Sequence, residues 1–329
     1  MSKKSSPRHG SLQYWPRKRA KKQIPRIRSW PDRDEKGLLG FAGYKVGMTH
    51  ITEIDQIKNS PTKGKRISTP VTVIECPSLI LYGVRVYEND IHGSNVSKEI
   101  SNPPKELSRK LSLPKKDKGQ KVVEFLNELS DNLENYSFIR ALVATKPKET
   151  GFSKKKPDIF EMALGGNIND QYEYVKENIG KEISVSDIFS EGVLTDVHAV
   201  SKGKGFQGTV KRFGISLRSH KSEKGRRGPG SIGDWKGTTY DVPMSGQTGY
   251  HLRTDYNKRI MYVSDDVEKV NANGGFLNYG LVKSSYILMK GSVPGPKKRL
   301  IRFNYALRPH KNVEKNNPKV IAISKESKQ

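Results

Sequence analysis

The stretch that decides how this chain is organised runs from Ser201 to His251 and reads SKGKGFQGTVKRFGISLRSHKSEKGRRGPGSIGDWKGTTYDVPMSGQTGYH. It carries too many glycines to be helical and too many charges to be buried. Structureless loops beyond roughly 15 residues are usually functional or disordered. Nine lysines and arginines stand against one acid, Glu223, between positions 201 and 230. Because closely spaced glycines let a backbone approach a bulky partner and cations favour a polyanion, we interpret residues 201–250 as a finger that binds nucleic acid.

The composition of the whole chain agrees with that interpretation. A length of 329 residues suggests about two domains, and the formal net charge is +26. A free monomeric enzyme gains nothing from such self-repulsion, whereas phosphates would neutralise it; the alternative is a merely solvated basic surface. The single cysteine, Cys76, excludes an internal disulfide and fits a reducing compartment. We find no apolar secretory signal and no run of 18 apolar residues, so we expect a cytoplasmic protein without a membrane span.

The first 31 residues contain ten lysines and arginines and no acid. Four prolines prevent a continuous helix, and Tyr14, Trp15 and Trp30 are interleaved with the cations. Aromatic rings among arginines suit stacking on exposed bases. We therefore predict an RNA-directed arm, with an inert disordered tail as the alternative.

Segments rich in β-branched and aromatic residues precede and follow residues 201–250, which predicts one β-domain that is interrupted twice. Residues 86–192 carry 18 acids and 16 bases, and apolar residues at helical spacing predict a helix around residues 122–133. Ser184 and Asp187 resemble a capping box that opens a short helix to Phe189. The predicted domains are the basic arm 1–35, a first barrel segment (36–87), an α/β insertion (88–180), a second barrel segment (181–200), the finger (201–250), a third barrel segment (251–310) and a polar tail (311–329).

Residues 203–210 match a nucleotide-binding pattern, GxGxxGxV, but lack its context. A dinucleotide fold needs a helix of ten or more residues next, and further glycines follow instead. A kinase would need VAIK, HRD and DFG motifs, which are absent, and no GxxxxGK[ST] occurs. The histidines and the cysteine lack metal-ligand spacing, and no nucleophile or carboxylate pair stands out. We predict no catalytic residue, no metal, no cofactor and no small-molecule substrate.

The segment FSEGVLTDVHAVSKGKGFQGTVKR, residues 189–212, resembles the signature of the universal L-three family, the third protein of the large ribosomal subunit. GSIGDW, VPMSGQTGYHLRTDYNKRI and GSVPGPKK, further along, resemble the same family in the same order. The N-terminal PRHGSLQYWPRKRAKKQIPRIRSWP is similar to the archaeal form. The resemblance covers residues 7–308 and is weakest in the insertion.

The resemblance implies a structural protein of the ribosome and not an enzyme. It implies a mainly β fold, namely a six-stranded Greek-key barrel of the translation-factor type with an α/β insertion, a long central finger and an extended basic N-terminal arm. Arm and finger would enter the rRNA, and the finger would approach the peptidyl-transferase centre with Trp235 at its tip. Partners would be large-subunit rRNA during early assembly, neighbouring proteins including the L-fourteen family, and translation factors indirectly. One departure lies at the tip, where Lys236 follows the tryptophan in place of the family's usual histidine.

The predicted rRNA-binding residues are cations, stacking aromatics and polar side chains of the arm, the finger and the barrel. They are Arg8, Trp15, Arg17, Lys18, Arg19, Lys21, Lys22, Arg26, Arg28, Trp30, Lys202, Lys204, Phe206, Gln207, Lys211, Arg212, His220, Arg226, Arg227, Trp235, Lys236, Gln247, His251, Arg253, Lys258, Arg259, Lys297 and Lys298. For Phe206, packing at the base of the finger is an equal alternative. Two other classes remain open: a duplex-DNA-binding protein, which the charge permits, and an RNA-modifying enzyme, which would need an acid/base set that we do not find.

Overall fold

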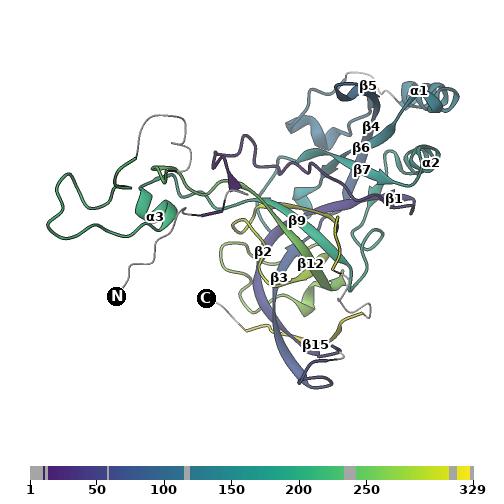
Figure 1. Cartoon of the computed structure of the whole chain (residues 1–329). Coiled ribbons are helices and arrows are strands. Elements are labelled where there is room, and N and C mark those ends of the chain that lie inside the picture. Colours follow the sequence, from purple (N-terminus) through teal and green to yellow (C-terminus); the bar gives the residue numbers. More distant parts are fainter. Residues whose placement is uncertain are drawn as a thin grey trace. The chain divides into compact units, whose positions relative to one another are not determined.

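The computed structural model describes residues 10–11, 14–57, 59–114, 119–232, 242–310 and 317–326 (Figure 1). Strands dominate, all sheets are antiparallel in the pairings described, and the predicted mainly β class is confirmed. The chain divides into two compact units. The smaller contains Met1–Gln23 and Val200–Arg253, and the larger contains Ile24–Ala199 and Thr254–Gln329.

The first sheet of the larger unit closes on itself. Its strands pair in the order β14-β9-β12-β13-β3-β2-β15, and β14 also pairs with β2, so six strands form a closed ring of pairings. The ring consists of β2 Gly40–Ile54, β3 Arg66–Glu75, β9 Leu194–Val200, β12 Leu252–Ser264, β13 Tyr286–Lys290 and β14 Leu300–Tyr305, and β15 Lys319–Ile323 lies outside it. The closing pair places Phe303 opposite Phe41, and both side chains are fully buried. A closed ring leaves no open edge except where β15 extends it.

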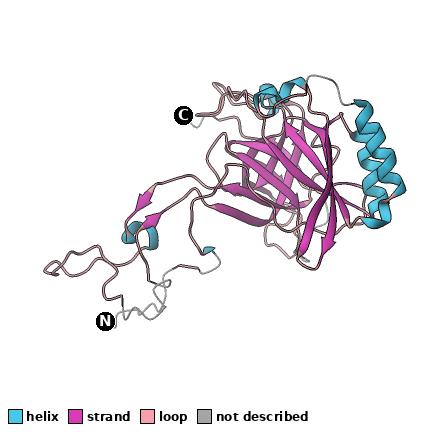
Figure 2. Cartoon of the chain, turned by 90° about the horizontal axis from the view of Figure 1, so that it is seen from above, coloured by secondary structure: helices cyan, strands magenta, loops and turns pink. Residues whose placement is uncertain are grey.

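The second sheet has the order β1-β7-β6-β4-β5, with β8 pairing to β4. The bounds are β1 Gly37–Leu38, β4 Leu79–Asp90, β5 Gly93–Ser101, β6 Phe138–Thr145, β7 Ile159–Gly165 and β8 Glu182–Ile183. Its helices are α1 Gly119–Asp131 and α2 Ile168–Asn178, which lie on one side of the strands (Figure 2). The predicted helix is confirmed, because Val122, Leu126 and Leu129 of α1 are buried. Helix α2, which begins with a capping box, was not predicted from the sequence.

Short 3-10 helices complete the larger unit, at Lys105–Arg109, Leu133–Asn135, Pro147–Glu149 and Val267–Lys269. One hydrophobic cluster runs through both sheets, from Phe41 in the ring to Met162 in β7. No described helix has the length and apolar character needed to cross a membrane.

Buried polar contacts also connect the ring to the second sheet. The Tyr44 hydroxyl, on β2, donates to Asp158 at 2.9 Å and lies 2.8 Å from the Thr145 hydroxyl. Burial, with the nearby Asp158 charge, raises the pKa of Tyr44 well above its usual value, so the hydroxyl stays protonated and can donate.

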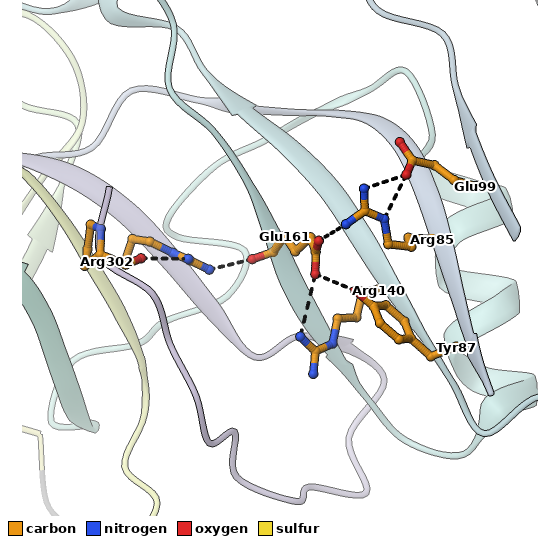
Figure 3. A network of polar contacts seen from close by, with 7 residues as sticks. Arg85, Tyr87, Glu99, Arg140, Glu161 and Arg302 are labelled. Atoms are coloured by element: carbon orange, nitrogen blue, oxygen red, sulfur yellow. Dashed lines mark hydrogen bonds and ion pairs between the residues drawn. The ribbon is translucent and has the colours of Figure 1, made fainter. Parts of the chain in front are cut away.

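Glu161, on β7, is the centre of a larger polar network (Figure 3). Its carboxylate accepts hydrogen bonds from Arg85 and from the Tyr87 hydroxyl, and Arg140 lies 3.7 Å away. The main-chain oxygen of Glu161 accepts from Arg302 of β14. Burial lowers the pKa of Arg302 to about 9, which still leaves the guanidinium charged at neutral pH. The network therefore connects three strands of the second sheet to the ring.

The structure differs from three of the expectations drawn from the sequence. Residues 79–87, expected in the first barrel segment, lie in β4 of the second sheet, because their partners are β5 and β6. Residues 184–189, expected as a helix, form only a turn, although Ser184 N–H does donate to Asp187. The expected polar tail contains β15, which pairs with β2.

Candidate nucleic-acid interface

The smaller unit brings the arm and the central loop together. The outgoing and returning strands of the loop pair as β10 Phe206–Gln207 and β11 Gly246–Gln247. Lys204 N–H donates to Thr248 O at 2.9 Å, and Ser201 N–H donates to His251 O at 2.9 Å, so the hydrogen-bonded ladder continues to the base of the loop.

Gly249 is required for that ladder. Its φ is +70°, and a Cβ added there would lie 2.0 Å from Lys202 O. No L side chain fits this position, because both the dihedral and the contact exclude it.

A short helix, α3 Thr209–Phe213, follows β10 directly. The sequence predicted no helix here, so this is a correction. It has five residues and ends at Gly214, which adopts a left-handed conformation with φ of +66°. A helix this short does not meet the requirement of a dinucleotide-binding fold, so the GxGxxG pattern has no structural support as a nucleotide site.

Phe213, at the end of α3, receives two side chains of the arm. Its ring stacks with Trp15 at a centroid distance of 5.9 Å, and the Arg17 guanidinium carbon lies 4.5 Å from the ring centroid. Such aromatic and cation–π contacts each contribute about 1 kcal/mol. The arm is therefore ordered against the loop along this segment.

Arg212 serves as an internal clamp. Its guanidinium donates to the main-chain oxygens of Met244 at 2.8 Å, Gln247 at 3.1 Å and Arg17 at 3.3 Å. Burial and the Arg17 charge lower its pKa, but an arginine stays charged at any physiological pH. We predicted a phosphate contact for Arg212; in the structure three of its N–H donors are directed to carbonyl groups of the protein.

His251 also has an internal position. Its side chain is 7% exposed, and Nδ1 lies 2.8 Å from Lys18 O, so Nδ1 carries the proton and donates. Ala20 N–H donates to Tyr250 O at 2.8 Å beside it. We predicted an RNA contact here, but burial gives His251 a structural role that ties the arm to the loop.

The other predicted residues of the smaller unit divide by exposure. Phe206 is 75% exposed, so it does not pack at the base of the loop. Exposed cations and histidine are Lys18, Arg19, Lys21, Lys22, Lys202, Lys204, Lys211, His220, Arg226 and Arg227. Half-buried are Trp15, Arg17, Gln207, Gln247 and Arg253. Arg8, Trp235 and Lys236 lie outside the described residues.

In the larger unit the predicted residues differ in exposure. Arg26, Arg28 and Lys298 are exposed, whereas Lys258, Arg259 and Lys297 are half-buried. Trp30 packs against the hydrophobic core, and Arg302 lies 5.8 Å from its ring centroid, so Trp30 serves the fold. Within the described ranges, no three His, Cys, Asp or Glu side chains gather in a metal-binding arrangement.

Three aromatic anchors were missing from the predicted set. Phe213 holds Trp15 and Arg17, Tyr250 lies 5.3 Å from the Arg19 guanidinium carbon, and Tyr14 lies 4.5 Å from that of Arg253. The alternation of arginine and aromatic residues in both segments was the available signal. It indicated stacking on bases, and the structure uses some of these rings for contacts between the arm and the loop.

Acid is expected to loosen the smaller unit through His251. Burial, followed by the charges of Arg253, Arg212 and Arg17, lowers the pKa of His251, and only the bond to Lys18 O opposes this shift. The unfolded chain therefore takes up a proton below about pH 6.5 that the folded unit excludes, so stability is full above that pH and falls below it. The loss is at most about 1.4 kcal/mol per pH unit.

Trp15 fluorescence, in a protein with Trp30 and Trp235 replaced by Phe, reports urea unfolding of this unit at pH 7.5 and 5.5. His251→Gln should remove the acid-dependent component of the loss. A His251→Gln protein with an unchanged pH dependence would contradict the assignment. His198 of the larger unit, whose pKa burial also lowers, is left intact as the internal reference.

Known proteins match this chain over its whole length. The family model of ribosomal protein L3 matches residues 1–329. The large ribosomal subunit protein uL3 of Methanobrevibacter smithii is 46% identical over 338 residues, covering 100% of this chain and 99% of that protein. The uL3 of Archaeoglobus fulgidus is 45% identical over 331 residues, covering 98% of each chain. The basic arm, the paired loop and these full-length matches agree, and the chain belongs to the ribosomal protein L3 family.

Proposed function

We propose that this chain is a structural constituent of the large ribosomal subunit in translation and binds large-subunit rRNA through the unit formed by its arm and loop. Membership of the family identifies a structural ribosomal protein and not an enzyme. The observation that carries the proposal is the composition of the smaller unit's surface, where Lys202, Lys204, Lys211 and the ring of Phe206 are all exposed. Cations bind phosphates and an exposed ring stacks on unpaired bases, which together suit folded RNA.

The finer elements of the proposal concern the path of the loop and its partners. We infer that the loop is a finger that reaches toward the peptidyl-transferase centre with Trp235 near its tip, and that binding supports early subunit assembly. The closed ring of six strands supports a Greek-key barrel of the translation-factor type as the mount. Neighbouring proteins, including the L-fourteen family, are the proposed protein partners, with translation factors affected indirectly.

A charge-removal experiment tests the central claim. Lys202, Lys204 and Lys211 are exposed and lie at the base of the loop, and their combined replacement by Gln should weaken binding of in vitro transcribed large-subunit rRNA. Each lost phosphate contact lowers the slope of log Kd against log salt by about 0.9, so three should lower it by about 2.7. Filter binding between 50 and 200 mM salt measures both quantities.

The matched control removes three exposed cations of the second-sheet region, Lys105, Arg109 and Lys110, and should leave Kd within about twofold. Equal losses in both variants would indicate general charge attraction and contradict a site in the smaller unit. Preference for duplex DNA over rRNA at equal salt would favour the DNA-binding alternative. Loss of the wild-type protein from large subunits in a high-salt wash would contradict its proposed role as a structural constituent of that subunit.

A further inference from the structure

Asp196, on β9, connects two segments that are distant in sequence. Its side chain is buried, and the two carboxylate oxygens accept from different main-chain N–H groups: Asn257 at 2.9 Å and Leu307 at 2.9 Å. The Asn257 side chain donates in turn to Arg308 O at 3.1 Å. These three bonds fix the main chain on both sides of one surface position.

Asn257 has a φ of +55°, which is uncommon for a residue other than glycine. Such a conformation persists where the surroundings determine it strongly, and it often marks a functional surface. Here the hydrogen bond from Asn257 N–H to the Asp196 carboxylate holds the main chain in this conformation. The preceding residue, Tyr256, is therefore presented from a rigid backbone.

Tyr256 is 54% exposed, and it is the one exposed aromatic side chain among the described residues of the larger unit. The guanidinium carbon of Arg308, also exposed, lies 5.7 Å from its ring centroid. The structure therefore places an accessible ring and a guanidinium side by side on a backbone that is already fixed. This arrangement costs little conformational entropy on binding.

We propose that Tyr256 and Arg308 form a second RNA-binding platform, on which an unpaired nucleotide of the rRNA stacks, with Asp196 as its positioning residue. The inference rests on the proposed function, because it needs a folded RNA partner. The ring offers a π face to a base, and the guanidinium can pair with the adjoining phosphate. Two cations follow along β12: Lys258, whose ammonium lies 3.6 Å from the Asp255 carboxylate, and the half-buried Arg259.

Tyr256→Ala should weaken binding of in vitro transcribed large-subunit rRNA about tenfold in filter binding at fixed salt, the usual effect of losing one base–aromatic stack. The slope against log salt should not change, since no charge is lost. Tyr256→Phe keeps the ring and should bind within about twofold of wild type. Ile91→Ala, at a 96% exposed apolar position of the second-sheet region, is the control and should also bind as wild type.

Arg308 and Asp196 provide independent readouts. Arg308→Ala should lower the salt slope by about one phosphate contact, and Arg308→Lys should restore that slope. Asp196→Asn should weaken binding, because an amide cannot accept from both N–H groups without opposing one of them. The double variant Asp196→Asn/Tyr256→Ala should bind rRNA with a Kd within about twofold of that of Tyr256→Ala alone. Asp196 acts through the Tyr256 ring, so its replacement has no further effect once the ring is gone.

Two results would overturn the platform. One is a Tyr256→Ala protein that binds rRNA with the wild-type Kd while the Lys202, Lys204 and Lys211 variant loses affinity as proposed, which leaves the proposed function intact. The other result combines two measurements. If Tyr256→Ala binds isolated rRNA with the wild-type Kd but is lost from large subunits in a high-salt wash, the surface binds a protein partner and not RNA. Failure of the wild-type protein itself to bind rRNA would instead overturn the proposed function and the platform with it.

Discussion

Deletion of residues 205–248, with a two-glycine linker in their place, is expected to leave the larger unit folded and to abolish most rRNA binding. The hydrophobic core that runs through both sheets takes no residue from positions 201–259. The linker can span the gap because Lys204 N–H and Thr248 O are 2.9 Å apart. The free energy of urea unfolding of the larger unit should therefore change by less than about 1 kcal/mol. Loss of the loop cations should weaken rRNA binding on the order of 10³-fold near physiological salt.

A same-length replacement of residues 205–248 by a Gly/Ser sequence is the control that separates charge from length. It should bind rRNA as poorly as the deletion. If the deleted protein aggregates or its Tm falls by many degrees, our division of the chain into mount and finger is wrong. If it enters large subunits as efficiently as wild type, the role of the loop in rRNA binding is wrong.

Glu75→Ala is expected to destabilise the larger unit by about 3 kcal/mol, the largest effect of a single substitution that we predict for stability. The Glu75 side chain is fully buried and accepts four hydrogen bonds. The donors are Lys283 N–H at 2.6 Å, Ser284 N–H at 3.0 Å, Gly151 N–H at 3.2 Å and the Tyr279 hydroxyl. Alanine leaves these buried donors without their acceptor, and each such loss costs about 1 kcal/mol or more.

The position of Glu75 makes this loss cooperative. Gly151 follows a 3-10 helix of the second-sheet region, whereas Lys283 and Ser284 precede β13 of the ring. Chemical denaturation followed by far-UV circular dichroism should show a lower midpoint for both sheets together. Glu177→Ala removes only an exposed ion pair with Lys36 and should change the free energy of unfolding by less than about 1 kcal/mol. A Glu75→Ala protein as stable as Glu177→Ala would contradict the role of the buried carboxylate.

Periodicity and composition predicted the elements that can be identified from their own residue pattern, without knowledge of their partners in the fold. The helical spacing of Val122, Leu126 and Leu129 indicated α1 because only one of its faces is buried. Residues 79–87 look the same whether they pair within the ring or within the second sheet. Their placement in β4 depends on partners at 93–101 and 138–145, and a single sequence does not specify which strands pair.

The candidate interface shows the same division between local and long-range information. Exposed lysines such as Lys202 and Lys204 follow directly from charge and glycine content. Arg212 and His251 have the same composition around them, yet their side chains bind main-chain oxygens of residues far away in sequence. The sequence indicates that a cation is present, but its partner is determined by the tertiary contacts of arm and loop.

The contacts between arm and loop also set an order of events during synthesis of the chain. Lys18 and His251 are separated by 233 positions, and Arg17 and Arg212 by 195. At roughly 5–20 residues per second, about 12–47 s pass between translation of Lys18 and translation of His251. The ring is delayed further, because β14 must emerge before it can pair with β2. We expect the second sheet to fold first on the translating ribosome. Until the loop is made, the arm lacks these contacts and its cations are accessible to any nearby polyanion.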